Sequence, residues 1–197
     1  MAALRVTAQG ITWGIKWGIK MRNLLFAAAL VIAAPVQAAV VDAGATGMEV
    51  KHAVHIAAPP QKVWEALIQP SRWWSSEHTF SGSAANLSLD PKAGGRWCET
   101  LPNGGSVMHM TVGFIAPPRS LVLRGALGPF YNLGIEGAMV WTLATKNGAA
   151  KDAETDVTLN YRAGGYVKDG FGKWAEPVDG VLAEQIARLK QAVEGKP

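Results

Sequence analysis

The sequence predicts an α+β domain in which an antiparallel sheet of seven strands wraps around one long C-terminal helix. Three observations support this prediction. One strand-like segment comes before a short helix, six more strand-like segments lie between residues 84 and 165, and a single long amphipathic helix ends the chain. The short, turn-rich connections between the later segments favour antiparallel hairpins over parallel crossovers.

The first strand and two short helices are expected before residue 80. Residues 48–57 alternate between apolar and polar side chains, as a half-buried strand does. Pro59-Pro60 ends this strand and opens a helix, because proline is tolerated in the first helical turn. Pro70 then stops that helix, and the segment SRWWSSEH at 71–78 predicts a second short helix or turn.

Six further runs predict the remaining strands of the sheet. Gly, Pro or Asn-Gly residues separate these runs and predict tight turns between them. The runs are ANLSLD (85–90), GGRWCETL (94–101), SVMHMTVGFI (106–115), SLVLRGAL (120–127), GAMVWTLAT (137–145) and TDVTLNYRA (155–163).

A long amphipathic helix is expected from about Pro177 to the helix stop at Gly195. Its apolar stripe consists of Val178, Leu182, Ile186, Leu189 and Val193. A helix of about 18 residues is about 27 Å long, so it covers only part of a seven-stranded sheet. We therefore expect a space between helix and sheet that side chains or a ligand must fill.

Residues 1–38 have the three parts of a secretory signal peptide. A basic start without acidic residues is followed by the uncharged run 24–35 and by the small-residue exit Val36-Gln37-Ala38. We expect cleavage after Ala38 and a periplasmic or secreted product, with Met1 and Met21 both open as the start. Residues 39–47 are then a linker, and residues 48–195 form the domain.

An uncleaved membrane anchor is the alternative reading of the leader. Pro35 and Gln37 interrupt its uncharged run, and the firmly apolar part is shorter than the roughly 20 residues that span a bilayer. No cysteine lies near the exit to carry a lipid. We therefore expect no stable membrane anchor after cleavage.

Charge and cysteine content exclude several classes of function. The net charge of +4 belongs to the leader, because the residues after Ala38 contain as many basic as acidic side chains. The mature chain thus has no surplus positive charge for nucleic acid. Cys98 is the single cysteine, which excludes an intramolecular disulfide. The four histidines lack metal-ligand spacing, so neither a metal nor another cofactor is expected.

The hairpin around LPNGGS defines two faces of the sheet. A two-residue turn at Asn103-Gly104 would set Cys98 opposite His109 and Glu99 opposite Met108. A β-bulge would swap the faces. Without one, the inner, apolar face carries Trp97, Glu99, Leu101, Met108, Met110, Val112 and Phe114.

Glu99 would then be the lone acid on an apolar inner wall. It is a candidate ligand anchor, or a general acid or base with a raised pKa. The alternative is a carboxylate that reaches solvent or pairs with an arginine. Cys98 facing His109 suggests a nucleophilic pair, but both lie on the predicted outer face, which favours a surface pair without a catalytic role.

Large aromatic side chains are expected to surround the opening of the cavity. Trp64, Trp73, Trp74, Phe130 and Tyr131 form this predicted rim, and the alternative for each is a place in the core. The predicted walls are Trp97, Met108, Met110, Val112, Phe114 and Trp141, with Glu99 as the only acid.

Four segments resemble the START-like superfamily, also called SRPBCC, whose helix-grip fold occurs in birch-pollen-type allergens, polyketide cyclases and lipid-transfer domains. They are IAAPPQKVWEALIQPSRWW (56–74), GGRWCETLPNGGSVMHMTV (94–112), APPRSLVLRGALGPF (116–130) and VDGVLAEQIARLKQAV (178–193). The resemblance covers residues 48–194. Within the superfamily, the segments are similar to an exported bacterial branch whose members are labelled polyketide cyclase or chaperone-ATPase activator. The resemblance implies the helix-grip fold, and this fold hosts many functions.

The leading hypothesis is periplasmic binding or transfer of a hydrophobic or amphipathic small molecule, such as a lipid, a polyketide-like or an aromatic compound. One alternative is a cyclase or hydrolase that uses Glu99 with a hydroxyl of Tyr131 or Tyr161. A co-chaperone-like interaction module is a second alternative, which the resemblance alone implies. The sequence leaves the ligand, catalysis and the oligomeric state open.

Overall fold

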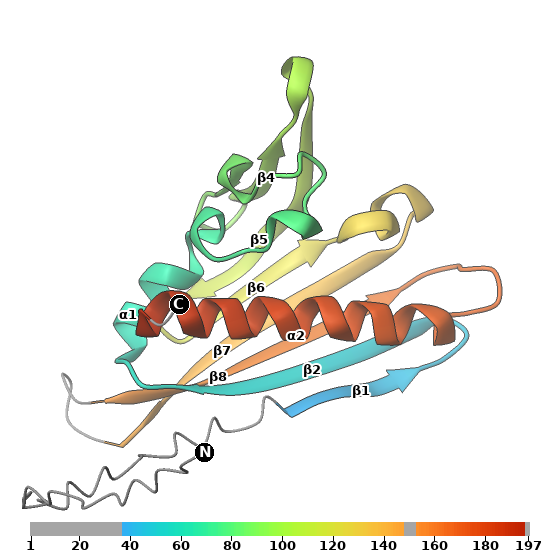
Figure 1. Ribbon diagram of the computed structural model, residues 1–197. Helices are drawn as coiled ribbons and strands as arrows, with labels where there is room; N and C mark the ends of the chain where they lie inside the picture. The colour runs from blue at the N-terminus through green and yellow to red at the C-terminus, as the bar shows by residue number, and fades with distance from the viewer. Residues whose placement is uncertain (1–36, 148–152, 196–197) are drawn as a thin grey trace, which may run out of the picture. The chain divides into compact units, whose positions relative to one another are not determined.

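A computed structural model describes residues 37–147 and 153–195 (Figure 1). Its strands form one antiparallel sheet in the order β1-β2-β8-β7-β6-β5-β4-β3. The α+β class and all seven expected strands are confirmed, but the sheet has 8 strands rather than seven. The strands are β1 Gln37–Ala43, β2 Gly47–Ile56, β3 Leu87–Leu89, β4 Arg96–Thr100, β5 Ser106–Ala116, β6 Ser120–Gly125, β7 Glu136–Lys146 and β8 Glu154–Gly164.

The additional strand is β1, which pairs with β2 at the edge of the sheet. Its residues 39–43 fall in the segment expected to be a linker. Val40 and Val41 are both exposed, so no alternation of buried and exposed side chains marks this strand. β1 is a strand because its backbone forms hydrogen bonds with β2. A pattern of side chains does not predict such pairing when neither face of the strand is buried. The remainder of the predicted leader lies outside the described residues.

Within the described residues, two α-helices and five short 3-10 helices accompany the sheet. The α-helices are α1 Pro60–Leu67 and α2 Gly172–Glu194, and the 3-10 helices are η1 Pro70–Arg72, η2 Ser76–His78, η3 Ala84–Asn86, η4 Pro102–Gly104 and η5 Gly128–Leu133. The long helix thus begins at Gly172 rather than at about Pro177. Pro177 lies in its second turn, where the missing N–H removes one hydrogen bond near the helix end. Neither α-helix of this part of the chain is long and apolar enough to cross a membrane.

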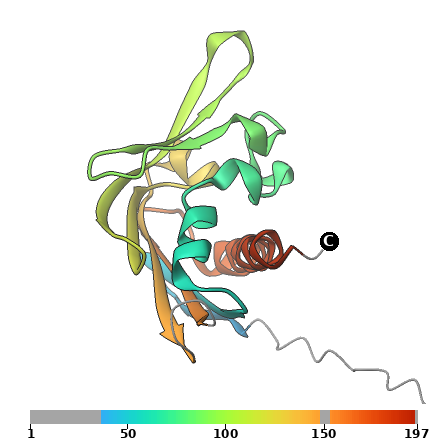
Figure 2. The ribbon, with the colours of Figure 1, turned by 90° about the vertical axis from the view of Figure 1, so that its left-hand side faces the viewer.

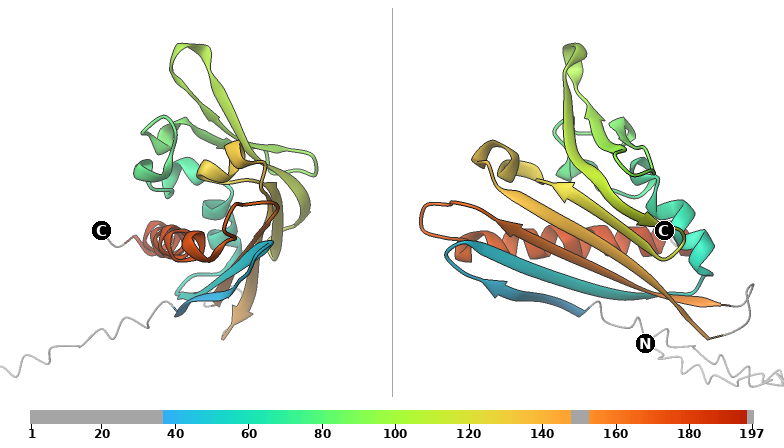
Figure 3. Two further views of the ribbon diagram at one scale, coloured as in Figure 1. Left: turned by 90° about the vertical axis from the view of Figure 1, so that its right-hand side faces the viewer. Right: turned by 180° about the vertical axis from the view of Figure 1, so that it is seen from behind.

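The sheet bends around α2, as the view along this helix shows (Figure 2). The helix packs on β2 and β1 with an apolar stripe that includes Leu182, Ile186 and Leu189. The segment with η1, η2 and η3 and the helix η5 lie on the same side of the sheet as α2 (Figure 3). These parts of the chain enclose the space that one helix leaves over the sheet.

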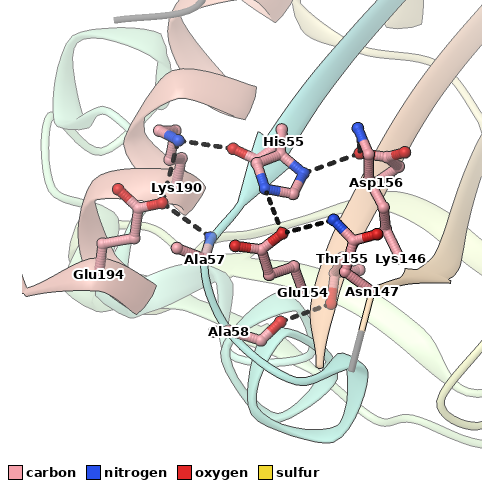
Figure 4. A network of polar contacts seen from close by, with 10 residues as sticks. All are labelled: His55, Ala57, Ala58, Lys146, Asn147, Glu154, Thr155, Asp156, Lys190 and Glu194. Atoms are coloured by element: carbon pink, nitrogen blue, oxygen red, sulfur yellow. Dashed lines mark hydrogen bonds and ion pairs between the residues drawn. The ribbon is translucent and has the colours of Figure 1, made fainter. Parts of the chain in front are cut away.

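A polar network fixes the C-terminal end of α2 against β2 and β8 (Figure 4). Lys190 Nζ donates a hydrogen bond of 2.5 Å to the carbonyl oxygen of His55 and lies 2.9 Å from Glu194 Oε1. The N–H of Ala57 donates to the same Glu194 oxygen at 3.0 Å. The ring of His55 lies 2.8 Å from a carboxylate oxygen of Asp156 on β8. These contacts hold the C-terminal end of α2 against the sheet.

Candidate functional site

A cavity of about 510 Å³ lies between α2, the sheet and the two loop segments. Its wall is mostly apolar, and aromatic rings make up much of it. The lining residues are Trp74, Glu77, His78, Thr79, Phe80, Leu87, Trp97, His109, Leu127, Gly128, Pro129, Phe130, Asn132, Tyr161, Trp174, Pro177, Val178, Val181 and Leu182. A volume of this size is typical of a small-molecule site.

The long helix anchors the loop wall of the cavity. The side chain of Gln185 is fully buried, and its Oε1 accepts a hydrogen bond of 2.9 Å from the N–H of Ser75. Its Nε2 lies 3.1 Å from Nδ1 of His78. One turn further, Arg188 Nε donates to the carbonyl oxygen of Trp73 at 2.8 Å. These bonds place the segment of Trp74, Glu77 and His78 across the cavity.

The expected aromatic rim divides between the cavity and the core. Trp74 and Phe130 line the cavity. Trp64, Trp73 and Trp141 are buried elsewhere in the core, where the rings of Trp73 and Trp141 meet edge to face at 5.8 Å. Tyr131 is half exposed and lies outside the lining residues.

A β-bulge changes the predicted faces of the hairpin. Trp97 pairs with Met110 as expected, but Cys98 pairs with Met108 and Glu99 with Val107, because the register shifts between Trp97 and Cys98. His109 is the residue that this bulge inserts in β5. The prediction that Cys98 faces His109 is therefore wrong, and Cys98 is only partly buried.

The exposed and buried residues of β5 follow from that bulge and from a second one. Met108 and Phe114, which were expected to face inward, are 42% and 53% exposed. A second register shift, between Val112 and Phe114, exchanges the faces of the strand, so Phe114 points outward and Ile115 packs against the core. Trp97, Met110 and Val112 are buried as expected, although only Trp97 lines the cavity. His109, which was expected to lie outside, is buried in the cavity wall.

Glu99 lies behind the cavity wall and does not line it. Its side chain is fully buried. Its oxygens accept hydrogen bonds from the backbone N–H groups of Phe80, at 3.1 Å, and of Ser81. Nε2 of His109 lies 3.0 Å from its Oε2. Glu99 is therefore paired with a histidine, rather than with an arginine or with solvent.

The electrostatics of this pair differ from the expectation of a raised carboxyl pKa. Burial raises the pKa of Glu99, but the hydrogen bonds from Ser81, Phe80 and His109 lower it more, and the net pKa lies below the usual value. Burial lowers the pKa of His109, and the neighbouring Glu99 opposes this only in part. The pair is thus a carboxylate beside a neutral imidazole at neutral pH.

Several polar groups of the cavity wall lack partners. Within the described residues, Nε1 of Trp97, Nε1 of Trp174 and Oη of Tyr161 are buried without a hydrogen-bond partner. Burial raises the pKa of Tyr161, and the nearby backbone of Leu127 opposes this shift only weakly. Buried donors are normally paired. These three atoms are fully enclosed by protein atoms, so they lie behind the cavity surface that a ligand touches.

Sequence reasoning missed His78, His109, Leu127, Trp174 and Val181 as lining residues. Trp174 lies just before Pro177 on the apolar side of the helix, and this position is a signal that the sequence contains. His109 gave no such signal, because the bulge alone turns it inward. Across residues 37–147 and 153–195, no group of three His, Cys, Asp or Glu side chains is arranged to hold a metal ion.

Comparison with known proteins supports this fold. The family model described as "Polyketide cyclase / dehydrase and lipid transport" matches residues 47–194. Among solved structures, CalU16 from Micromonospora echinospora is 16% identical, covers 83% of this chain and 87% of its own, and has a TM-score of 0.55. The conserved protein of unknown function EF2215 from Enterococcus faecalis is 16% identical, covers 80% of this chain and 76% of its own, and has a TM-score of 0.53.

A third solved structure has a similar fold. Truncated norcoclaurine synthase from Thalictrum flavum is 15% identical, covers 78% of this chain and 98% of its own, and has a TM-score of 0.50. At these identities the similarity of the structures shows the fold alone. No curated protein matches the chain.

Proposed function

We propose that this chain, which belongs to the polyketide cyclase/dehydrase and lipid transport family, binds or transfers a hydrophobic or amphipathic small molecule in its cavity. The mostly apolar cavity of about 510 Å³ is the observation that carries the proposal. Lipids, polyketide-like compounds and aromatic compounds belong to this ligand class.

The energy of such binding comes from burial of apolar surface. A ligand that loses about 300 Å² of apolar surface to the cavity gains on the order of 7 kcal/mol, before the entropic costs of binding. The polar side chains of Asn132 and His109 in the cavity wall add places for a few polar ligand atoms. These groups favour an amphipathic ligand over a pure hydrocarbon, because a hydrocarbon would leave them unpaired.

Export is the second part of the proposal. The basic, apolar and small-residue parts of residues 1–38 support a signal peptide, and the charges of the remaining chain cancel. The ligand would then be carried in the periplasm or outside the cell.

A cavity-filling variant tests the proposal. An apolar fluorescent probe should bind the unchanged protein, and Val178→Trp should remove this binding while the protein stays folded, because the indole enters empty space. Met110→Trp is the matched control. Met110 was expected in the cavity wall, but it is 1% exposed in the packed core, so this variant should lose about 1–3 kcal/mol of stability. If the probe binds Val178→Trp unchanged, or does not bind at all, the proposed function is wrong.

Acid–base catalysis is a second candidate function, and the buried Glu99–His109 pair favours it. Glu99 itself does not reach the cavity, so His109 would be the group that contacts a substrate and Glu99 would position it. The hydroxyl of Tyr161 lies in the same cavity wall. Turnover of a bound aromatic ester or polyketone that His109→Phe abolishes, with unchanged probe affinity, would support this function. Equal turnover in both proteins would exclude it.

A further inference from the structure

We propose that the ligand of this cavity donates a neutral hydroxyl group, from a phenol or an enol, to Nδ1 of His109, and that the cavity disfavours anionic head groups. This inference rests on the proposed function, because it names the chemical class of ligand for the same cavity. It follows from the tautomer of one histidine, the charges around it and the rings beside it.

Glu99 fixes which nitrogen of His109 carries the hydrogen. The backbone N–H groups of Phe80 and Ser81 donate to both oxygens of Glu99, which is the arrangement of an ionised carboxylate. A carboxylate is an acceptor only, so Nε2 of His109, 3.0 Å away, must be the donor. In a neutral imidazole the other nitrogen, Nδ1, then has a free lone pair.

Nδ1 is available to a ligand. It forms no hydrogen bond with any described residue. It is also not one of the buried atoms that lack both a partner and accessible surface, so part of its surface is accessible. His109 belongs to the cavity wall, with its ring between Phe80, stacked at 5.8 Å, and Trp97, tilted at 5.6 Å. These rings hold the imidazole in one orientation.

The charges around His109 are unfavourable for an anion. Among the described residues of the cavity wall there is no lysine or arginine, and Glu77 is the one with a charged side chain. The carboxylate of Glu99 lies directly behind the imidazole. Burial keeps the pKa of His109 low, so the ring stays neutral at pH 7. A ligand carboxylate would meet a lone pair and two acidic groups, whereas a neutral hydroxyl would donate a hydrogen bond.

The rings around this acceptor favour an aromatic ligand body. Trp74 and Trp97 meet edge to face at 4.8 Å, and Phe130 and Trp174 lie 5.3 Å apart. All four line the cavity. Flat rings pack well in edge-to-face and offset arrangements with such walls. A hydroxylated aromatic or enolic ring system thus meets both the apolar walls and the acceptor nitrogen of His109.

Three naphthalene derivatives of similar size separate these contributions. Their affinities for the purified exported protein are measured by displacement of the apolar fluorescent probe at pH 7.5. We expect 2-naphthol to bind about five- to tenfold more tightly than 2-methoxynaphthalene, since one hydrogen bond contributes about 1 kcal/mol. We expect 2-naphthoate to bind most weakly. Equal binding of all three, or tightest binding of the naphthoate, would overturn the inference and leave the proposed function intact. If none binds while the probe also fails, the proposed function is wrong as well.

Two histidine variants locate the effect. His109→Phe should abolish the preference for naphthol over its methyl ether while the ether binds as before. His78→Phe is the matched control for the ratio of the two affinities, because His78 lines the same cavity but its Nδ1 already lies 3.1 Å from Gln185 Nε2. Loss of this contact lowers both affinities if the loop wall shifts, and the ratio of naphthol to ether affinity should stay the same. If His109→Phe does not fold, ¹⁵N NMR of the unchanged protein decides. Nδ1 of His109 should be unprotonated and should shift when naphthol is added, and a protonated or unresponsive Nδ1 would contradict the inference.

Discussion

Nε2 of His109 lies 3.0 Å from Oε2 of Glu99, and both side chains are buried where β5 meets β4. The pair places one polar side chain, that of His109, in a cavity wall that is mostly apolar. Glu99 acts through His109 and through the backbone of residues 80 and 81, and only the histidine reaches the cavity. The pair therefore links the stability of the domain to the chemistry of its site.

Glu99→Ala should destabilise the protein. The change removes the acceptor of three buried or half-buried donors, and an unpaired buried donor costs about 1–3 kcal/mol. We expect the free energy of unfolding to fall by at least about 2 kcal/mol, measured by urea denaturation. Glu176→Ala, an exposed acid on α2, is the control and should stay within about 0.5 kcal/mol. Equal stability of the two variants would mean that the Glu99 bonds contribute nothing.

The protein should lose stability as the pH falls below about 6.5. Burial lowers the pKa of both His52 and His109 in the folded protein, against the opposing effect of Asp179 and Glu99. The unfolded chain then binds protons that the folded protein does not, so acid favours unfolding. Each histidine contributes a slope of up to about 1.4 kcal/mol per pH unit between its two pKa values.

The lowered pKa of Glu99 also makes the protein less stable in acid, at a lower pH than the histidines do. The carboxylate of Glu99 stabilises the folded protein fully above the pKa of an unfolded glutamate. This stabilisation is lost as the pH falls through the pKa of Glu99 in the folded protein. Urea midpoints between pH 8 and pH 5 measure the total effect. His52→Phe should flatten the dependence of stability on pH, because the variant lacks the fully buried imidazole whose protonation favours unfolding. Constant stability toward pH 5 would show that the two histidines have ordinary pKa values, and increasing stability would show that their pKa values are raised. Either result would contradict the prediction.

Gly125→Ala should disturb the position of His109. Gly125 has a φ of 145°, and an added Cβ would lie 2.4 Å from the carbonyl oxygen of His109. The backbone must shift at the bulge, with a cost of at least about 1 kcal/mol. Gly113→Ala is the matched control, because its Cβ meets the Arg124 side chain at an ordinary 3.6 Å. Gly125→Ala should lower both the melting temperature and the affinity for naphthol, and Gly113→Ala should change neither. Identical behaviour of the two variants would argue against a role of Gly125 in positioning His109.

Cys98→Ser should leave ligand affinity unchanged within about twofold. Cys98 is a free, partly exposed thiol opposite Met108 and outside the cavity wall. Probe titration of both proteins measures the affinity. A loss beyond tenfold, about 1.4 kcal/mol, would show that the thiol takes part in binding.

The exported protein should begin at Ala39. The exit Val36-Gln37-Ala38 predicts cleavage after Ala38, which would leave most of β1 on the mature chain. N-terminal sequencing of the exported product is the measurement. A product that retains residues 24–35 would contradict the prediction.

The sequence by itself determined the elements and their order. Alternation in residues 48–57 and in the six later runs identified every strand except β1, and the stripe from Val178 to Val193 identified the long helix. These patterns are local, because burial of one face fixes a period of two in a strand and 3.6 in a helix. The cavity also followed from the sequence, since one helix cannot cover so wide a sheet.

Only the tertiary structure decided which side chains form the site. The prediction that the cavity is lined by Trp74, Trp97 and Phe130 is confirmed. The prediction for Met108 and Phe114 is wrong, because both face outward. One bulge at His109 caused much of this difference, because a single inserted residue exchanges the faces of a strand. No local pattern marks that bulge. Its position depends on Gly125 of the neighbouring strand and on the buried carboxylate of Glu99, which meet His109 only when the sheet is assembled.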